Sequence, residues 1–155
     1  MSIRRKDRAM SSEDAEEMLE NALVGRLGTS FKNKPYVVPL NFVYSNKKIY
    51  FHCAKNGKKL EIIADNSHVC FEVDEFLGIK QDEKPCSFGS YYKSAMAFGK
   101  AKVLEKSEKK AKALKKILSK YATELIDFAF NMEELGRVEV VEILVDRITG
   151  KQSLP

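Results

Sequence analysis

Residues 34–63 read KPYVVPLNFVYSNKKIYFHCAKNGKKLEII. The run 35–44 is rich in aromatic and branched side chains that favour a β-strand, and Ser45-Asn46-Lys47 supplies a polar turn after it. Residues 48–54 predict a second strand that returns antiparallel to the first. Pro39 lies inside the first strand and cannot donate a ladder hydrogen bond, so we expect an edge, a bulge or a ligand site there.

The end of this segment predicts a helix that begins with two cations. Asn56-Gly57 interrupts the strand pattern, and residues 58–65 have helical spacing, with these side chains facing the core: Leu60, Ile63 and Ala64. Lysines at a helix N-terminus are unfavourable by roughly 0.3–1 kcal/mol each, and a bound anion would reverse that sign. Lys58 and Lys59 therefore indicate a phosphate site, and simple solvation of both side chains is the alternative.

Further helices and strands flank this segment. The patterns predict an extended arm over 3–8, a helix over 12–23, strands over 24–31, 68–74, 91–105 and 138–149, a loop over 75–88, and a helix over 107–131 that breaks near Ala122 or Thr123. Short turns between the first three strands favour an antiparallel meander. Six strands with separated helices predict one mainly β or α+β domain over 1–155, a small closed barrel with flanking helices.

The charge of the chain is concentrated in one segment. The 155 residues carry 27 Lys+Arg and 22 Asp+Glu, a formal net charge of +5. Removing the seven lysines and one glutamate of 106–120 leaves 20 basic and 21 acidic residues. We expect a solvated lysine stripe beside an apolar one formed by Ala111, Leu114, Leu118, Tyr121, Leu125 and Phe128. Nucleic-acid binding through these lysines is an alternative, which the lack of interleaved aromatic residues disfavours.

Composition also limits the class of protein. No apolar run approaches the ~20 residues that span a bilayer, and the first residues lack the apolar stretch of a secretory signal. Cys53, Cys70 and Cys86 are separated by 17 and 16 residues, which matches neither a zinc site nor a disulfide framework. We therefore expect no membrane association, no metal site, reduced thiols and a cytoplasmic location. A redox-active Cys53 would need cationic neighbours.

Two features near the centre of the segment suggest a ligand. The backbone beside Pro39 could bind a flat heterocycle, unless 37–41 is simply a bulged core strand. His52 alternates with Tyr50 and Ala54 on one face of its strand, where a packed histidine is the alternative to a catalytic one.

The sequence resembles the FMN-binding split-barrel superfamily of pyridoxamine 5′-phosphate oxidase-related proteins, and within it most closely the nitroimidazole-resistance (Nim-type) branch. The stretches that carry the resemblance occur in the expected order and cover nearly the whole chain: RRKDR, VGRLGTS, KPYVVPLNFVY, KIYFHCAKNGKKLEII, HVCFEVD, YYKSAMAFGKAKVLE and DRITGKQS.

The resemblance implies a six-stranded antiparallel split β-barrel with flanking helices, assembled as a homodimer with FMN at two interface sites. It implies an isoalloxazine lined by Val38, Pro39, Leu40 and Asn41. It places His52, Cys53 and Ala54 near the ring or ribityl chain, and Gly57, Lys58 and Lys59 at the phosphate. The region of Tyr92, Lys93 and Ser94 would approach the flavin from the partner subunit.

The resemblance also bears on the reaction. Pyridoxamine phosphate oxidases resemble one another in arginine-rich phosphate sites and in a C-terminal motif with arginine and histidine. Here the C-terminal segment has Arg147 but no histidine. In the Nim-type branch the histidine that matches His52 is associated with the active site. We therefore expect an FMN-dependent reductase of a small acceptor such as a nitro-aromatic, with His52 as a proton donor. A non-catalytic flavin-binding module and a pyridoxamine 5′-phosphate oxidase-like enzyme are the alternatives.

Overall fold

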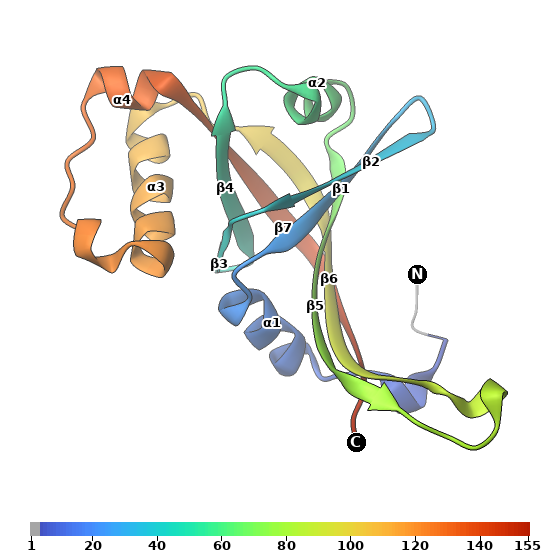
Figure 1. The fold of residues 1–155 in the computed structure, drawn as a ribbon. Coiled ribbons are helices and arrows are strands. Elements are labelled where there is room, and N and C mark those ends of the chain that lie inside the picture. Colours follow the sequence, from blue (N-terminus) through green and yellow to red (C-terminus); the bar gives the residue numbers. More distant parts are fainter. Residues whose placement is uncertain (1–3) are drawn as a thin grey trace.

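One antiparallel sheet forms the centre of the molecule (Figure 1). The computed structural model describes residues 4–155, in which the sheet has seven strands in the order β2-β1-β5-β6-β7-β4-β3. The strands are β1 (Gly25–Phe31), β2 (Lys34–Leu40), β3 (Val43–Ser45), β4 (Lys48–Ala54), β5 (His68–Lys80), β6 (Gly89–Val103) and β7 (Val138–Ser153). The fold is mainly β, as predicted. The sheet, however, has seven strands instead of six, and β2 and β3 at its two ends do not pair with each other, so the barrel is not closed.

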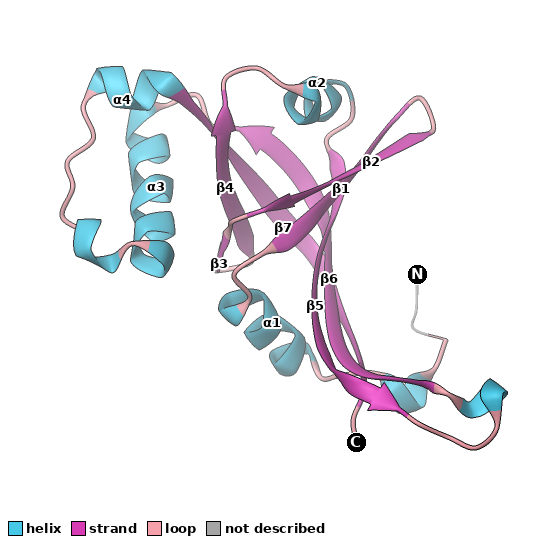
Figure 2. Ribbon diagram, in the orientation of Figure 1, coloured by secondary structure: helices cyan, strands magenta, loops and turns pink. Residues whose placement is uncertain are grey.

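Helices surround the sheet, as the cyan segments of Figure 2 show. In the described residues they are α1 (Ser12–Asn21), α2 (Lys58–Asp65), α3 (Ser107–Tyr121) and α4 (Met132–Arg137), with 3-10 turns at Lys6–Arg8, Pro85–Ser87 and Thr123–Leu125. The 3-10 turn over Lys6–Arg8 replaces part of the extended arm expected over 3–8, of which residue 3 lies outside the described residues. None of the described helices is long and apolar enough to cross a membrane.

The predicted strand 35–44 divides into two. Both predicted antiparallel hairpins are present, β1 with β2 and β3 with β4. They lie at opposite ends of the sheet order, so they do not form the continuous meander that was predicted. Phe42 lies between the two strands, and its backbone N–H donates to the hydroxyl of Tyr121 at 2.9 Å. A side chain 79 positions away thus takes the hydrogen bond that a continuous strand would have used. Pro39 lies on β2 at the end of the sheet, which confirms the predicted edge.

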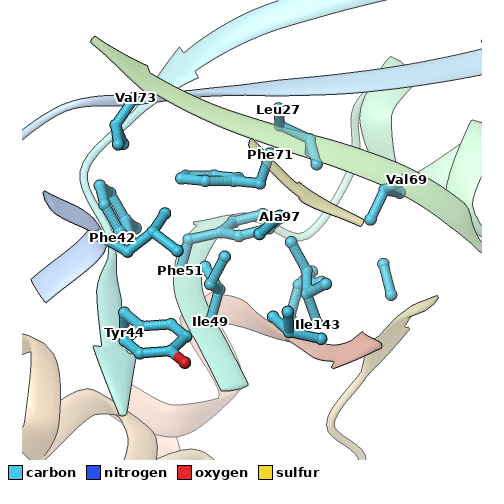
Figure 3. Close-up of a cluster of buried hydrophobic side chains, with 14 of the residues drawn as sticks. Leu27, Phe42, Tyr44, Ile49, Phe51, Val69, Phe71, Val73, Ala97 and Ile143 are labelled. Atoms are coloured by element: carbon cyan, nitrogen blue, oxygen red, sulfur yellow. The ribbon is translucent and has the colours of Figure 1, made fainter. Parts of the chain in front are cut away.

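The core lies inside the curved sheet (Figure 3). Phe42, Phe51 and Phe71 are fully buried, and the rings of Phe42 and Phe71 lie with centroids 4.6 Å apart. Burying side chains of this size stabilises a fold by about 1.5–3 kcal/mol each. Gly25 is required beside them, because a Cβ at that position would lie 2.1 Å from the Phe71 ring.

The loop expected over 75–88 is mostly a hairpin. β5 continues to Lys80 and pairs with the start of β6, so that the two strands project from the body as an arm (Figure 1). The sequence shows no strand periodicity here, because the pairing register shifts between Phe76 and Gly78 and the arm has no buried face. Phe76 and Ile79 are both exposed.

The helices lie close to the predicted positions, but the residues that they bury differ in part from the predicted ones. α1 buries Ala15 and Leu19, and its N-cap Ser11 accepts the Asp14 N–H at 3.0 Å. α2 has the predicted bounds but buries Ile62 with Ile63, and Ala64 is exposed.

The break in the predicted helix 107–131 occurs where it was expected. α3 ends at Tyr121, and Ala122 is its C-cap. The helix buries Leu114 of the predicted stripe, and Ala111 and Tyr121 pack against the same cluster. The prediction omitted Ala113 and Ile117, which are also buried. Leu125 and Phe128 are exposed because they lie beyond the end of the helix.

Candidate functional site

The start of α2 presents hydrogen-bond donors without a cap. Gly57 precedes the helix with φ 155°, a conformation that favours glycine, and it supplies no side-chain cap. The first N–H groups of a helix have no intrahelical acceptor, so those of Lys58 and Lys59 point out of its N-terminus. A Cβ on Gly57 would meet nothing within 4 Å, which leaves room for a ligand to approach the backbone. Two backbone donors and two ammonium groups are a donor set that fits a phosphate.

A cleft adjoins this helix start. It lies between the β1–β2 hairpin and α2, has a volume of about 420 Å³, and is called here the hairpin cleft. Its lining is Phe31, Lys34, Pro35, Tyr36, Lys58, Glu61 and Ile62. The Lys58 ammonium lies 4.8 Å from the centroid of the Tyr36 ring. Sequence reasoning missed this cleft, although the aromatic residues that flank the turn at 32–33 were a signal for it.

Cys53 lies at the end of β4, close to α2. Its side chain packs against the core, and burial raises the pKa of its thiol, although the nearby Lys59 ammonium acts in the opposite direction. Because the net direction is upward, the structure favours a protonated, packed thiol over the redox-active alternative.

His52 faces away from the core. Along β4, Ile49 and Phe51 are buried while His52 is exposed on the other face, as the predicted alternation requires. The imidazole lines a groove of about 280 Å³ between β4 and the α3–α4 region, called here the His52 groove. Its other lining residues are Leu114, Ile117, Leu118, Phe128, Phe130, Glu134 and Val138. His52 is therefore the polar side chain of a mainly apolar groove, together with Glu134, which also accepts the Asn131 N–H at 2.8 Å.

The β2 residues divide between the two faces of the edge strand. Val38 and Leu40 pack against the core, whereas Pro39 is exposed, as is Asn41, the residue that follows β2. The Asn41 amide donates to the Leu23 carbonyl at 3.3 Å. The exposed side of this edge strand is therefore the part of β2 that a ligand can reach.

One protomer does not bring all the predicted site residues into one cavity. His52 and Lys58 line different cavities. Ser94 lies on β6 between Asp74 and Lys151, and its hydroxyl donates to the Lys151 carbonyl at 3.4 Å. Gly57, Lys58 and Lys59 are adjacent, with Cys53 and Ala54 at the neighbouring strand end.

Several lysines of α3 make bonds that hold this helix in place. Lys110 pairs with Glu139 at 2.7 Å, the Lys116 ammonium donates to the Ser45 hydroxyl at 2.8 Å, and the Lys120 ammonium donates to the Ala22 carbonyl at 2.6 Å. Burial lowers the pKa of Lys120. Two of the seven lysines therefore anchor α3 to the sheet and a third anchors it to the end of α1, which weakens the interpretation of the stripe as a nucleic-acid surface.

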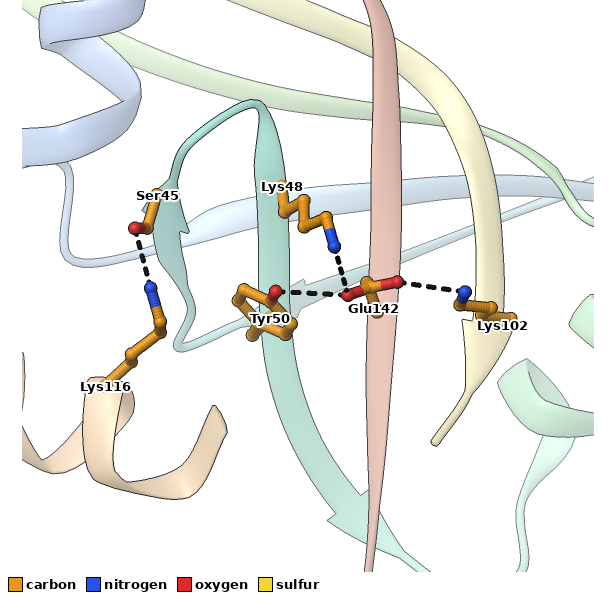
Figure 4. Close-up of polar contacts among 6 residues, drawn as sticks. All are labelled: Ser45, Lys48, Tyr50, Lys102, Lys116 and Glu142. Carbon is orange, nitrogen blue, oxygen red and sulfur yellow. Dashed lines mark hydrogen bonds and ion pairs between the residues drawn. The ribbon is translucent and has the colours of Figure 1, made fainter. Parts of the chain in front are cut away.

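A buried carboxylate lies on the sheet under the same helix (Figure 4). Glu142 on β7 pairs with Lys48 at 3.0 Å and Lys102 at 3.1 Å, and accepts the Tyr50 hydroxyl at 3.1 Å. Three protein side chains thus surround this carboxylate, an arrangement typical of a structural ion pair. Within residues 4–155 no three histidine, cysteine or carboxylate side chains gather as metal ligands would.

Comparisons with known proteins agree with this architecture. A sequence profile of the family described as pyridoxamine 5′-phosphate oxidase matches residues 11–152. A candidate 5-nitroimidazole antibiotic resistance protein from Bacteroides thetaiotaomicron is 31% identical, with a TM-score of 0.78 over 92% of this chain and 85% of that chain. A FAD-binding protein from Mesorhizobium loti is 25% identical, with a TM-score of 0.69 over 94% of this chain and 97% of that chain.

A more distant likeness concerns the fold alone. A flavocytochrome from Azotobacter vinelandii is 16% identical, with a TM-score of 0.87 over 99% of this chain and 73% of that chain. A comparison with curated proteins returned no match. Because the profile covers nearly the whole chain, this protein belongs to the pyridoxamine 5′-phosphate oxidase family.

Proposed function

We propose that this chain is a flavin-dependent oxidoreductase that reduces small acceptors such as nitro-aromatic compounds. The observation that carries the proposal is the arrangement at the end of β4. An exposed histidine in an apolar groove precedes, by five residues, a helix start with four donors suited to a phosphate. Five residues span at most about 17 Å, a reach comparable with the length of FMN.

The cofactor would be held through its FMN portion. Gly57, Lys58 and Lys59 would bind the phosphate, because the backbone N–H groups at this helix start have no side-chain cap and the two lysines add positive charge. Val38, Pro39 and Leu40 of the edge strand β2 and the following Asn41, together with 52–54, would adjoin the ring, as the family resemblance implies. When bound, the flavin supplies the redox chemistry, and the protein supplies position and electrostatics.

The acceptor would occupy the His52 groove. The volume of about 280 Å³ suits a single aromatic ring, and the lining is mainly aliphatic and aromatic. An imidazole in such a groove can donate a proton to an acceptor that gains electrons. Glu134 disfavours acceptors that carry a negative charge at the same point.

The complete site would require a homodimer. The predicted residues lie in separate places on one protomer, and large apolar side chains are exposed on the sheet, among them Val37 at 61% and Met96 at 42%. A second copy that covers this surface would bring Ser94 of one chain towards the flavin of the other. The homodimer rests on the family resemblance and on this exposed surface, whereas the FMN portion of the cofactor rests on the resemblance and on the donors at the start of α2.

The test uses the purified full-length protein. We expect a visible flavin spectrum, bleaching with NAD(P)H under anaerobic conditions, and reoxidation by a nitro-aromatic acceptor. His52→Ala should leave flavin content unchanged and slow reoxidation, because it removes the proton donor. His68→Ala, at another exposed histidine, is the matched control. Equal reoxidation rates for wild type and His52→Ala would remove His52 from the mechanism.

A further inference from the structure

The hairpin cleft has the size and lining of a small-molecule site. Its volume of about 420 Å³ lies within the roughly 300–1,000 Å³ of ligand pockets. Phe31 and Tyr36 contribute two aromatic rings, and Pro35 and Ile62 contribute aliphatic surface. Such walls suit a flat, aromatic ligand.

The charges around the cleft are mostly positive. Lys34 and Lys58 line it, against one carboxylate, that of Glu61. The Lys58 ammonium lies 4.8 Å from the Tyr36 ring centroid, and the Lys32 ammonium lies 5.0 Å from that of Phe31. Cations placed over aromatic rings beside an aromatic-lined cleft complement a ligand that combines a flat ring with phosphate.

The cleft adjoins the start of α2 at Lys58. Lys58 belongs both to the cleft lining and to the donor set after Gly57. A group bonded to a phosphate at Gly57–Lys59 can therefore extend directly into the cleft. FMN ends at that phosphate, whereas FAD continues from it into an adenylate.

We propose that the hairpin cleft binds the adenylate half of FAD, so that this chain binds FAD more tightly than FMN. The inference rests on the proposed flavin site for the shared FMN portion. The adenine would stack on Tyr36 or Phe31, and Lys34 would neutralise the second phosphate. Loss of one stacking partner is expected to weaken FAD binding roughly 5- to 150-fold.

The experiment measures flavin affinity in the protein stripped of flavin. FAD and FMN are titrated separately, and binding is followed by quenching of flavin fluorescence. We expect a Kd for FAD at least tenfold below that for FMN. Tyr36→Ala and Lys34→Glu should raise the Kd for FAD, and leave the Kd for FMN within about twofold. Lys80→Glu, an exposed lysine at the end of β5, is the control for charge.

Several outcomes would overturn the assignment. Equal affinities of the wild type for FAD and FMN would contradict it, and so would a Tyr36→Ala variant that loses both flavins equally. If neither flavin binds, the proposed flavin-dependent function is wrong, and the adenylate site is then tested separately with ADP. Absence of ADP binding would overturn the adenylate site as well. Competition of NADPH with ADP, alongside equal FAD and FMN affinities, would assign the cleft to a nicotinamide dinucleotide instead.

Discussion

The hydroxyl of Tyr121, the last residue of α3, lies 2.9 Å from the backbone nitrogen and 2.7 Å from the carbonyl oxygen of Phe42. It accepts the N–H and lies within donating distance of the carbonyl, so a helix end satisfies the backbone where β2 gives way to β3. The same hydroxyl lies 2.8 Å from the Leu23 carbonyl, and burial raises its pKa. One side chain thus joins α3 to the residue between β2 and β3 and to the segment that precedes β1.

Removing this hydroxyl should destabilise the fold. Tyr121→Phe leaves the Phe42 N–H, next to a fully buried ring, without its acceptor, which costs about 1–3 kcal/mol. Urea unfolding measures the change, with Tyr91→Phe on the β5–β6 arm as the control. Identical midpoints for Tyr121→Phe and wild type would contradict this role.

Glu142 should make stability depend on acid pH. Burial alone would raise the pKa of Glu142, but its bonds with Lys48, Lys102 and Tyr50 outweigh burial and lower it below the ordinary value of 4.5. A lowered pKa in the folded state contributes stability that is present above pH 4.5 and is lost as the pH falls through the folded value.

Glu142→Gln should therefore cost about 1–3 kcal/mol at pH 7 and progressively less below pH 4.5. Denaturant unfolding of both proteins between pH 3 and pH 7 measures the difference. The matched control is Glu108→Gln, whose carboxylate pairs with Lys112 on the exposed face of α3. A constant difference across that pH range would show that the carboxylate charge is not the source.

The three thiols should differ in reactivity. Burial raises the pKa of both Cys53 and Cys70, whereas Cys86 is exposed at the tip of the β5–β6 arm. Iodoacetamide at pH 7 should modify Cys86 first, because the thiolate is the nucleophile and access is greatest there. Peptide mass spectrometry over time gives the order. Modification of Cys53 ahead of Cys86 would restore the redox-active interpretation.

The lysines at the start of α2 should control flavin retention. Lys58→Glu combined with Lys59→Glu should release the cofactor, because two cations near its phosphate become anions. Glutamates suit the positive end of a helix dipole, so the helix itself should remain folded. Lys106→Glu with Lys109→Glu makes the same change at the start of α3 and should retain the flavin. Full retention of the yellow colour by the α2 variant after dialysis would refute the phosphate assignment.

A larger side chain in the His52 groove should weaken the binding of the acceptor and leave the binding of the flavin unchanged. Leu118→Trp adds a ring to a half-buried wall of the groove, which should raise the KM for nitro-aromatic acceptors tenfold or more. Flavin content and the rate of reduction by NAD(P)H should not change, because α2 and β2 are untouched. An unchanged KM would place the acceptor elsewhere.

Local patterns predicted those elements whose causes are local. The bounds of α2, the alternation that puts His52 opposite Phe51 on β4 and the break after Tyr121 follow from turn residues and periodicity within about ten positions. The division of the strand at Phe42 does not, since its cause is a hydroxyl 79 positions away. The β5–β6 arm was missed because no face of it is buried.

The site was predictable only in part for the same reason. Lys58 and Lys59 are adjacent in sequence, and their unfavourable place at a helix start is visible there. The hairpin cleft joins Tyr36 to α2 across more than twenty residues, and the His52 groove joins β4 to α3 and the segment that follows it. Such contacts depend on tertiary packing, which periodicity does not encode.

The most direct measurement is the absorption spectrum of the purified wild-type protein, combined with the mass of the small molecule that it releases on denaturation. We predict a flavin spectrum and one flavin per chain, with a released mass equal to that of FAD or FMN. A colourless protein that also fails to take up added FAD and FMN would contradict flavin binding, and with it the proposed oxidoreductase.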